Sequence, residues 1–393
     1  MNKRLDIVCH AFPSWRGDYM KSTVQLMKEL AATNNVLYVD YAYSIKDVLV
    51  NTRHNKYIPV KRILGLDAAI EKVQLENGAF IHVLSLPPVI PFNWINNNSL
   101  LNFVQGINQK IINGRIKSAM KKLNMNSPIV VNAFNPFFNS VKQSGFKQKA
   151  TIYYCYDNIA ASNWASKHGQ RLENDFAKQA DALVFSSEAL QQSKAVSDKK
   201  SFVVTNGVDL TIFENEMKKG FPKNNSDEIN IGYVGSIDDR LDYDLLEQTI
   251  SNFPTWKFHF IGRIMSASAD RLKKYSNVKL YGAVDVNQLP AMMKNFNAGI
   301  IPFIKDEFTR NIYPMKANEY LALGLPVVMT NFAQLNDLAN FVSAVDAKDF
   351  IQSLTLEIEN DTFEKKQQRV KIAISNSWKN KAAAFEKILH QYA

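Results

Sequence analysis

The chain has 393 residues, 46% of them hydrophobic and 21% charged, which excludes a disordered protein and favours two domains over one. Its apolar runs have the length of strands, so we expect neither a transmembrane helix nor a secretory signal, and Cys9 and Cys155 lie inside such runs, as reduced core thiols of a cytosolic protein do. The net charge of +10 is confined to residues 1–200, with 25 Lys and Arg against 14 Asp and Glu, whereas residues 201–393 carry 22 against 23.

Strand-like runs alternate with helical patterns through the first half, which predicts an α/β fold with parallel strands and crossover helices. The expected strands lie at residues 5–10, 36–41, 128–134, 151–157, 182–187 and 201–207. His10 ends the first run, where it is either a core residue or a catalytic base. Gly17 is expected at the start of the following helix, as a possible contact to a donor phosphate. Asp157 ends the run at 151–157, a standard position for an active-site carboxylate at the edge of a parallel sheet.

Two segments of the first half are candidates for contact with a membrane. The segment 101–150 has eight basic residues and no acidic one, and Lys110, Lys117 and Lys121 lie on an expected amphipathic helix. This surface is a solvated basic face, a docking surface for anionic lipid or a nucleic-acid site, and no nucleic-acid-binding motif supports the last. The proline-broken apolar segment 81–95 is either a loop that touches lipid or a lipid-linked acceptor, or a packed loop.

The second half repeats the alternating pattern after a polar, asparagine-rich segment at 209–228, in which we expect the linker. Its strands are expected at residues 229–235, 257–262, 278–284, 298–304, 326–330 and 341–345, and an amphipathic helix follows Trp378. We therefore expect domains at residues 1–208 and 209–376, and a last segment at 377–393.

Glycines and arginines follow two strands of the second half. Gly235 ends the first of them, where a backbone without a side chain lets a ligand approach closely. Arg240 and Arg263 are expected at the same edge of the sheet, where two guanidinium groups suit a diphosphate. For Arg240 an ion pair with a neighbouring aspartate is an equal alternative. Asp238 and Asp239 resemble helix N-terminal acids more than metal ligands, so we expect no metal.

The segment 312–328 predicts an anion site at the start of a helix. Pro314 suits the first turn of a helix, Gly324 its end, and buried strands are expected on both sides. The free N–H groups of such a helix start lie beyond a strand's carboxyl end, where open α/β sheets bind ligands. Lys316 opposes the helix dipole and requires a nearby anion, for which a phosphate is the first candidate. Glu319, more than one turn into the helix, can accept hydrogen bonds from the hydroxyl groups of a ribose.

Four segments, in this order, resemble those of GT-B glycosyltransferases, and most closely of glycosyltransferase family four with its teichuronic-acid-type and surface-polysaccharide members. They are VVTNGVDLTIF at 203–213, GYVGSIDDRLDYDLL at 232–246, YGAVDVNQLP at 281–290 and TRNIYPMKANEYLALGLPVV at 309–328. The resemblance implies two Rossmann-like, doubly wound parallel-sheet domains facing across a cleft, with the last helix crossing back to the first domain.

The resemblance also implies roles for single residues. Glu319 would bind the donor ribose, and the helix start at Tyr313 and Pro314 would hold the diphosphate together with the basic residues. The segment with Gly282, Ala283, Val284 and Leu289 would line the base. Many members have a glutamate where this chain has Asn311, and a second basic residue beside the match to Arg240. These two differences bear on the identity of the donor sugar more than on nucleotide binding.

The function expected from the sequence is a retaining, metal-independent glycosyltransferase without a cofactor. Its partners would be a nucleotide diphosphate-sugar donor of the UDP or GDP type, a glycan or lipid-linked acceptor, and the inner face of the plasma membrane, but no nucleic acid. Arg240 and Lys316 would stabilise the leaving diphosphate, while Asp157 or His10 would meet the acceptor hydroxyl. The alternatives are a nucleotide-sugar epimerase of the same fold and a non-catalytic binding subunit.

Overall fold

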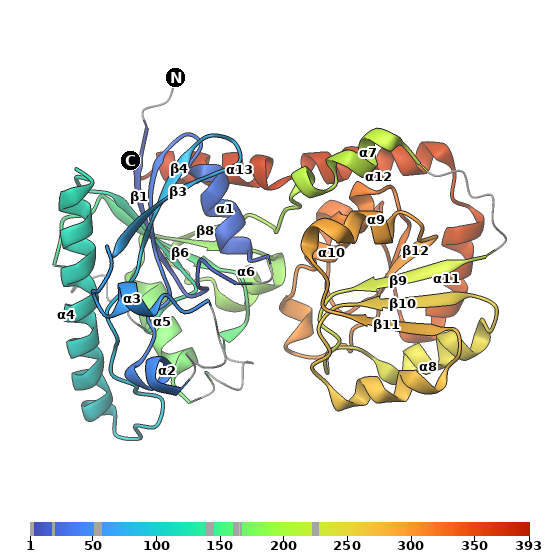
Figure 1. Cartoon of the computed structure of the whole chain (residues 1–393), viewed down its shortest axis with the longest axis horizontal. Coiled ribbons are helices and arrows are strands. Elements are labelled where there is room, and N and C mark those ends of the chain that lie inside the picture. The colour runs from blue at the N-terminus through green and yellow to red at the C-terminus, as the bar shows by residue number, and fades with distance from the viewer. Residues whose placement is uncertain are drawn as a thin grey trace. The chain divides into compact units, whose positions relative to one another are not determined.

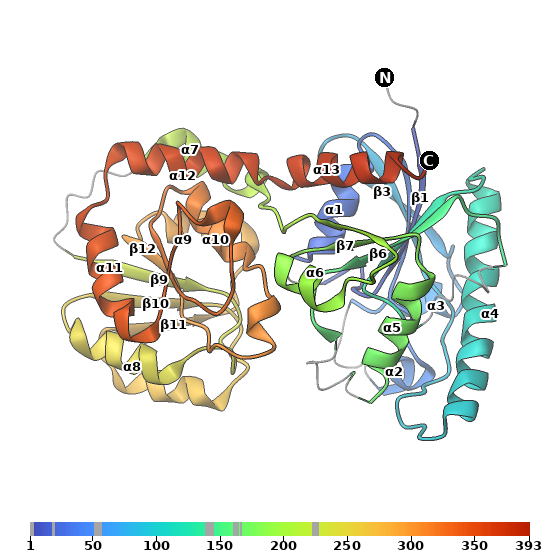
Figure 2. The same cartoon turned by 180° about the vertical axis from the view of Figure 1, so that it is seen from behind.

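The computed structural model describes residues 4–17, 20–50, 57–137, 145–159, 165, 167–221 and 228–393. The chain forms two compact units, one of residues 1–205 with 381–393 and one of residues 206–380. Each unit has its own sheet flanked by helices (Figures 1 and 2). Both units therefore have the predicted α/β architecture.

The first unit has an eight-stranded sheet in the order β3-β4-β2-β1-β5-β6-β7-β8, and β3 alone runs antiparallel to its neighbour. The strands are β1 (Asp6–Ala11), β2 (Asn35–Val39), β3 (Ile70–Gln74), β4 (Phe80–Leu84), β5 (Ile129–Ala133), β6 (Ala150–Cys155), β7 (Ala182–Phe185) and β8 (Lys200–Val203). The central strands β1, β5 and β6 are buried almost throughout, because helices cover both faces of a parallel sheet. Cys9 and Cys155 are free thiols in this core, as predicted.

The helices of the first unit connect these strands. They are α1 (Ser22–Leu30), α2 (Ile45–Val50), α3 (Val60–Ile63), α4 (Asn98–Lys122), α5 (Gly169–Gln179) and α6 (Glu188–Lys194). The basic helix expected after residue 100 is α4, whose first turn is capped by the Asn97 side chain accepting from the Leu100 N–H at 3.0 Å. Helix α4 lies along the outside of the unit, and α2 lies near its first turns in both views (Figures 1 and 2).

The expectation for residues 81–95 needs a correction. The segment begins with β4, which with β3 was not among the expected strands, and Leu86, Val89, Phe92 and Ile95 after it are buried. The packed-loop alternative therefore holds for most of the segment. Trp94 is the exception, since 69% of it is exposed.

The second unit has a six-stranded sheet in the order β11-β10-β9-β12-β13-β14, and every pair in it is parallel. All six strands were predicted: β9 (Asn230–Val234), β10 (Lys257–Ile261), β11 (Val278–Gly282), β12 (Ala298–Ile301), β13 (Val327–Thr330) and β14 (Ser343–Val345). The strand order reverses between β9 and β12. In doubly wound sheets this reversal leaves a crevice at the carboxyl ends of the strands, where ligands bind.

The second unit's helices include six 3-10 turns that begin or join longer elements. The α-helices are α7 (Glu214–Lys219), α8 (Tyr243–Asn252), α9 (Leu289–Met293), α10 (Met315–Ala322), α11 (Phe350–Glu359) and α12 (Phe363–Ser375), and the 3-10 turns are η4 (Leu210–Ile212), η5 (Ala267–Lys274), η6 (Val286–Gln288), η7 (Thr309–Asn311), η8 (Asn336–Leu338) and η9 (Ala347–Asp349). The last helix, α13 (Trp378–His390), begins in this unit, and residues 381–393 belong to the first.

Residues 209–221 do not form the linker expected at 209–228. They form η4 and α7, and Phe213 lies fully buried in the core of the second unit. The chain passes between the units at residues 205–206 and again at 380–381. Among the described residues, no helix combines the length and apolar character needed to cross a bilayer.

Candidate functional site

The start of α10 lies at the carboxyl end of β12, as the sequence predicts. The loop between them is held by Thr309, which is fully buried and whose hydroxyl donates to the Ile304 carbonyl at 2.6 Å, while its N–H donates to Asp306 at 2.7 Å. Helix α10 begins at Met315, with Pro314 as the residue before it rather than inside its first turn. Pro314 offers no side-chain cap to the helix start.

Glu319 and Lys316 form an ion pair on α10. The Lys316 ammonium lies 2.9 Å from Oε1 and 2.8 Å from Oε2 of Glu319, so both carboxylate oxygens are engaged. The Glu319 side chain is 2% exposed and that of Lys316 26%. In this structure, Glu319 is therefore the anion that lies beside Lys316. The expected contact between Lys316 and a phosphate remains a prediction.

The carboxyl ends of β9, β10 and β11 are joined through three glycines. The Gly235 N–H donates to the Ile261 carbonyl at 2.9 Å, and the Gly262 N–H donates to the Gly282 carbonyl at 2.8 Å. Gly262 has a φ of +154°, and a Cβ there would lie 1.8 Å from the Gly235 carbonyl oxygen. Only glycine fits at this contact, so this edge presents backbone rather than side chains. Sequence reasoning missed Gly262, although a glycine directly after a strand is the same signal that identified Gly235.

Arg240 has the partner that the alternative interpretation proposed. Its guanidinium donates to both Asp238 oxygens, from Nε at 2.8 Å and from Nη2 at 2.6 Å, and lies 5.1 Å from the centre of the Phe303 ring. Because Phe303 follows β12, Arg240 lies at the strand-order reversal. Arg263 follows Gly262 at the same edge and is exposed. Asp239 accepts a hydrogen bond from Ser266.

The other predicted donor-site residues differ in how they are exposed. Ala283 is exposed, Val284 half-buried and Leu289 buried at the start of α9. Asn311 is almost fully buried and donates to the Glu307 carbonyl at 2.7 Å. The Tyr313 ring is also buried, and its hydroxyl donates to Asp337 at 2.8 Å. Tyr313 therefore supports the helix start from inside the fold.

Hydrogen bonds tie the predicted groups of the second unit together. The Ile304 N–H donates to the Arg240 carbonyl at 2.7 Å, which joins the loop after β9 to the loop after β12. The Val234 N–H, at the end of β9, donates to the Tyr320 hydroxyl on α10 at 2.8 Å. Gly235 and Glu319 are the sequence neighbours of these two residues. The structure thus brings Gly235, Arg240 and the Lys316–Glu319 pair to one place at the strand-order reversal.

In the first unit, His10 lies on β1 inside the sheet, and Asp157 lies beyond the carboxyl end of β6. His10 is opposite Val39 of β2 and Asn132 of β5 and is fully buried, and neither ring nitrogen has a hydrogen-bond partner among the described residues. Burial lowers the pKa of His10 to about 4, so the ring is neutral at pH 7. Asp157 is half-buried two residues after β6, and its carbonyl accepts from the Cys155 thiol at 3.4 Å.

The expected position of Gly17 at the start of a helix is wrong, because α1 begins at Ser22. Gly17 has a φ of +155° and lies beside the Lys21 side chain. The Lys21 ammonium donates to the Ser14 and Arg16 carbonyls, both at 2.6 Å, and a Cβ on Gly17 would lie 2.7 Å from it. This role of Lys21 was not predictable from the sequence, since its partners are backbone atoms.

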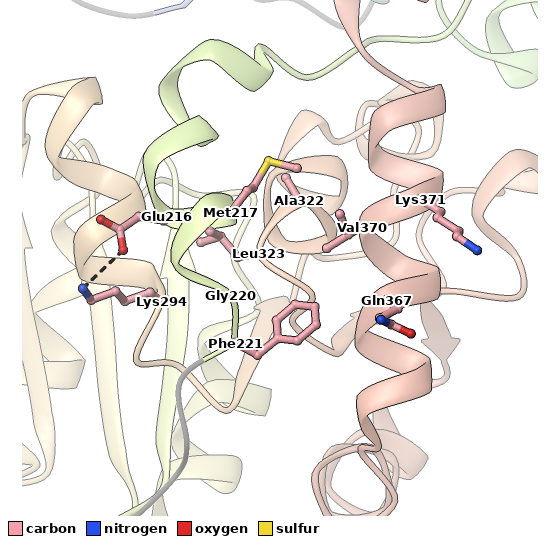
Figure 3. Close-up of a pocket in the computed structure, with 10 residues that line it drawn as sticks. All are labelled: Glu216, Met217, Gly220, Phe221, Lys294, Ala322, Leu323, Gln367, Val370 and Lys371. Carbon is pink, nitrogen blue, oxygen red and sulfur yellow. Dashed lines mark ion pairs between the residues drawn. The ribbon is translucent and has the colours of Figure 1, made fainter.

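A pocket of about 370 Å³ in the second unit lies away from these residues (Figure 3). It is lined by Met217 and Phe221, by Ala322 and Leu323 at the far end of α10, and by Val370 on α12. Glu216 and Lys294 form an ion pair of 3.2 Å at its edge. None of the predicted site residues lines this pocket, so it is not the predicted donor site.

The two α/β units, each with a largely parallel sheet, have the architecture of the GT-B fold. Residues 228–359, which lie within the second unit, match the family of glycosyl transferases group 1. The candidate teichuronic acid biosynthesis glycosyltransferase TuaH of Bacillus subtilis is 26% identical over 253 residues, which are 58% of this chain and 63% of that protein. The match thus spans less than two thirds of that relative's length.

Solved structures with the same fold cover nearly the whole chain. Sucrose-phosphate synthase from Thermosynechococcus elongatus superposes with a TM-score of 0.68 at 15% identity, over 99% of each chain. The Anabaena protein HepE, solved in complex with UDP and glucose, superposes with a TM-score of 0.59 at 12% identity, over 99% of this chain and all of that one. At these identities the likeness confirms the predicted fold.

Proposed function

We propose that this protein is a glycosyltransferase that moves a sugar from a nucleotide diphosphate-sugar to a glycan or lipid-linked acceptor in the synthesis of a surface polysaccharide. The observation that carries the proposal is the buried Glu319 beside Lys316 at the start of α10, next to the glycine edge of the sheet. The family match of the second unit and the described role of the Bacillus relative support the same reaction.

The Lys316–Glu319 pair suggests how the donor is bound. The two Glu319 oxygens that accept from Lys316 are the acceptors that two ribose hydroxyls need, and the Lys316 ammonium suits the diphosphate. Donor binding would exchange partners, with Lys316 moving to the phosphates and Glu319 to the ribose. Lys316 would then pair with the phosphates, and the buried Glu319 carboxylate would keep hydrogen bonds, now from the ribose hydroxyls, so neither group would be left without a partner.

The leaving diphosphate would be stabilised by positive groups of the second unit. The groups that would donate hydrogen bonds to the diphosphate are Lys316, the exposed Arg263 and the N–H groups at the start of α10. Arg240 would contribute less, because Asp238 already offsets its charge. We propose a metal-independent reaction with retention of configuration, as the resemblance implies. Of the two candidates in the first unit, Asp157 is the better placed to meet an acceptor hydroxyl, because His10 is fully buried.

Glu319→Gln tests the donor site. We expect UDP or GDP, whichever wild type binds, to bind roughly 10-fold to 100-fold more weakly to the variant, because a charged group with two acceptor oxygens becomes a neutral amide with one. The matching nucleoside, which lacks phosphates, should lose affinity as well, whereas Lys316→Met should weaken only the diphosphate. Calorimetry with the nucleotide and with the nucleoside, on each of the two variants, measures these four affinities. Glu359→Gln, an exposed change on α11, serves as the control.

Wild-type nucleoside affinity in Glu319→Gln would show that Glu319 does not hold the ribose. A nucleotide-sugar panel followed by an assay of released nucleotide then tests the reaction. Release that depends on an acceptor supports transfer, release without any acceptor indicates the epimerase alternative, and binding without release indicates a non-catalytic subunit.

We also propose that the first unit contacts an anionic membrane through a surface that we call the apolar end patch. It consists of the exposed side chains Ile45, Leu49, Val50, Trp94, Leu100 and Phe103. The Ile45 N–H donates to the Val89 carbonyl at 2.9 Å, which places α2 beside the loop that carries Trp94. Large exposed apolar side chains gathered on neighbouring elements are typical of a surface that contacts a partner or a membrane.

Basic side chains adjoin the apolar end patch. Lys46 lies on α2, and Lys167 donates to the Trp94 carbonyl at 3.2 Å. On α4, Lys110 and Lys117 follow Phe103 at seven-residue intervals, so they share its face of the helix, and both are exposed. Apolar side chains next to lysines match the acyl chains and the charged head groups of an anionic lipid surface.

A further inference from the structure

The segment 203–213, which carries part of the family resemblance, has no role in the donor site described above. Within it, Asn206 is 7% exposed and is bonded to both sides of the α10 start. Its amide donates to the Tyr313 carbonyl at 3.1 Å, and its own backbone carbonyl accepts from the Asn318 amide at 3.4 Å. Tyr313 directly precedes Pro314, and Asn318 directly precedes Glu319. Asn206 therefore contacts the two ends of the segment proposed to hold the donor.

The same contacts continue from Asn318 to a second distant segment. The Asn376 amide donates to Asn318 Oδ1 at 3.1 Å. The Asn318 amide also lies 3.3 Å from the Tyr313 hydroxyl. Asn318 is fully buried and Asn376 is 5% exposed, so loss of any of these bonds would leave a polar group unsatisfied inside the fold. We call Asn206, Asn318 and Asn376 the amide cluster.

Asn206 is the first residue of the second unit, and Asn376 lies four residues before its last residue, Asn380. The Val208 N–H donates to the Asn376 carbonyl, and the Trp378 N–H donates to the Val208 carbonyl, both at 3.0 Å. A Cβ on Gly207 would lie 2.8 Å from the Trp378 nitrogen, so the two backbones are in direct contact. The first passage, at residues 205–206, directly precedes this paired backbone, and the second, at residues 380–381, follows it. Both passages thus adjoin the paired backbone of residues 206–208 and 376–378. The amide cluster connects this backbone to the start of α10 by hydrogen bonds.

We propose that Asn206 and Asn318 are positioning residues that couple nucleotide binding at α10 to residues 206–208 and 376–378. This inference rests on the proposed function, because it takes the α10 start as the donor site. Separation of Lys316 from Glu319 would move Glu319, which directly follows Asn318. The buried amide groups would move together with Asn318, because they cannot separate without losing hydrogen bonds. Nucleotide binding should therefore make the paired passages more rigid.

Hydrogen exchange on the full chain, read by mass spectrometry, tests this coupling. In wild type, saturating UDP or GDP should slow exchange of the Val208 and Trp378 amides several-fold. In Asn318→Ala, the same amides should exchange several-fold faster without nucleotide, and the nucleotide should bind roughly tenfold more weakly. The wild-type measurement stands even if the variant does not fold.

Asn277→Ala is the matched control. Asn277 donates to the Phe253 and Trp256 carbonyls, both at 3.1 Å, in the same unit but outside the amide cluster. It should lower stability without changing exchange at Val208 and Trp378. Asn318→Gln, which keeps the amide, should recover part of the nucleotide affinity that Asn318→Ala loses.

The outcomes separate this inference from the proposed function. Wild type that binds a nucleotide without protecting the two amides overturns the coupling alone. Unchanged exchange in a folded Asn318→Ala overturns it as well. Wild type that binds neither UDP nor GDP at any concentration tested overturns the proposed donor site, and the coupling falls with it.

Discussion

His10 is a fully buried imidazole on the central strand of the first unit, and its protonation should oppose folding. Its pKa is lowered to about 4 from an ordinary value near 6.5, because burial disfavours the charged ring. The unfolded chain therefore binds a proton between pH 6.5 and 4 while the folded chain does not. Stability is intact above pH 6.5 and falls as the pH drops toward 4, by at most about 1.4 kcal/mol per pH unit from this residue.

His10→Leu should remove this contribution. Wild type should lose about 2 kcal/mol more than the variant between pH 7.5 and pH 5, measured as the free energy of unfolding of the first unit in urea. At pH 7.5 the variant should be at least as stable as wild type, because an imidazole without a hydrogen-bond partner among the described residues is replaced by an apolar side chain. Parallel pH profiles would mean that His10 is protonated, or bonded, in the folded protein.

Single residues show where reasoning from the sequence succeeds and where it stops. The position of Glu319 on a buried helix was predictable, because the apolar pattern on both sides of it indicates buried strands. The partners of Lys316 and Arg240 were harder to predict. A charge needs a nearby counter-charge, but the helical spacing of Lys316 and Glu319 and the turn that joins Asp238 to Arg240 decide which one it meets. The amide cluster was not predictable, since its members lie far apart in the chain.

At the scale of elements, α10 is locked to the second sheet by one tyrosine. The Tyr320 hydroxyl accepts from the Val234 N–H at 2.8 Å and lies 3.3 Å from the Gly232 carbonyl. Its ring lies across Gly299 of β12, where a Cβ would be 2.4 Å from the nearest ring carbon. The ring cannot move aside without breaking these bonds. The glycine therefore sets the distance between α10 and the sheet.

Gly299→Ala should push α10 away from β12. We expect a loss of about 2 kcal/mol in the free energy of unfolding of the second unit, as in other overpacked cores, together with weaker nucleotide binding. Gly114→Ala is the control, because Gly114 lies on α4 with no atom within 4 Å of a Cβ there, and alanine should be neutral or slightly stabilising. Urea unfolding and calorimetry on both variants give the comparison. Unchanged nucleotide affinity in Gly299→Ala would separate the position of α10 from donor binding.

The strands of the two sheets differ in how well the sequence predicts them. The six strands of the second unit are buried and apolar, and each lies within its expected run. The missed pair β3 and β4 is different, because β3 has the sequence IEKVQ and none of its residues is fully buried. An edge strand that is half in water lacks the continuous apolar run of a parallel strand. Strand β4 was hidden in a segment that its prolines made look like a loop.

At the scale of the whole molecule, the charge is divided between the two units in the way the proposed reaction needs. The first half of the chain carries the whole positive excess, and the apolar end patch lies in the same unit. The second half is nearly neutral and carries the proposed donor site. In the proposed reaction, a lipid-linked acceptor would thus meet the unit that carries the apolar end patch, while the donor would bind the other unit.

Vesicle binding tests this division. Wild type should sediment with vesicles of phosphatidylglycerol and phosphatidylcholine, and much less with phosphatidylcholine alone or at high salt, because the lysine contribution is electrostatic. The double variant Leu49→Ser with Trp94→Ser should lower the partition coefficient roughly tenfold or more, since two large side chains no longer enter the interface. Leu356→Ser, at a side chain 49% exposed in the second unit, is the control. Equal binding of the double variant and the control would exclude the apolar end patch as the membrane contact.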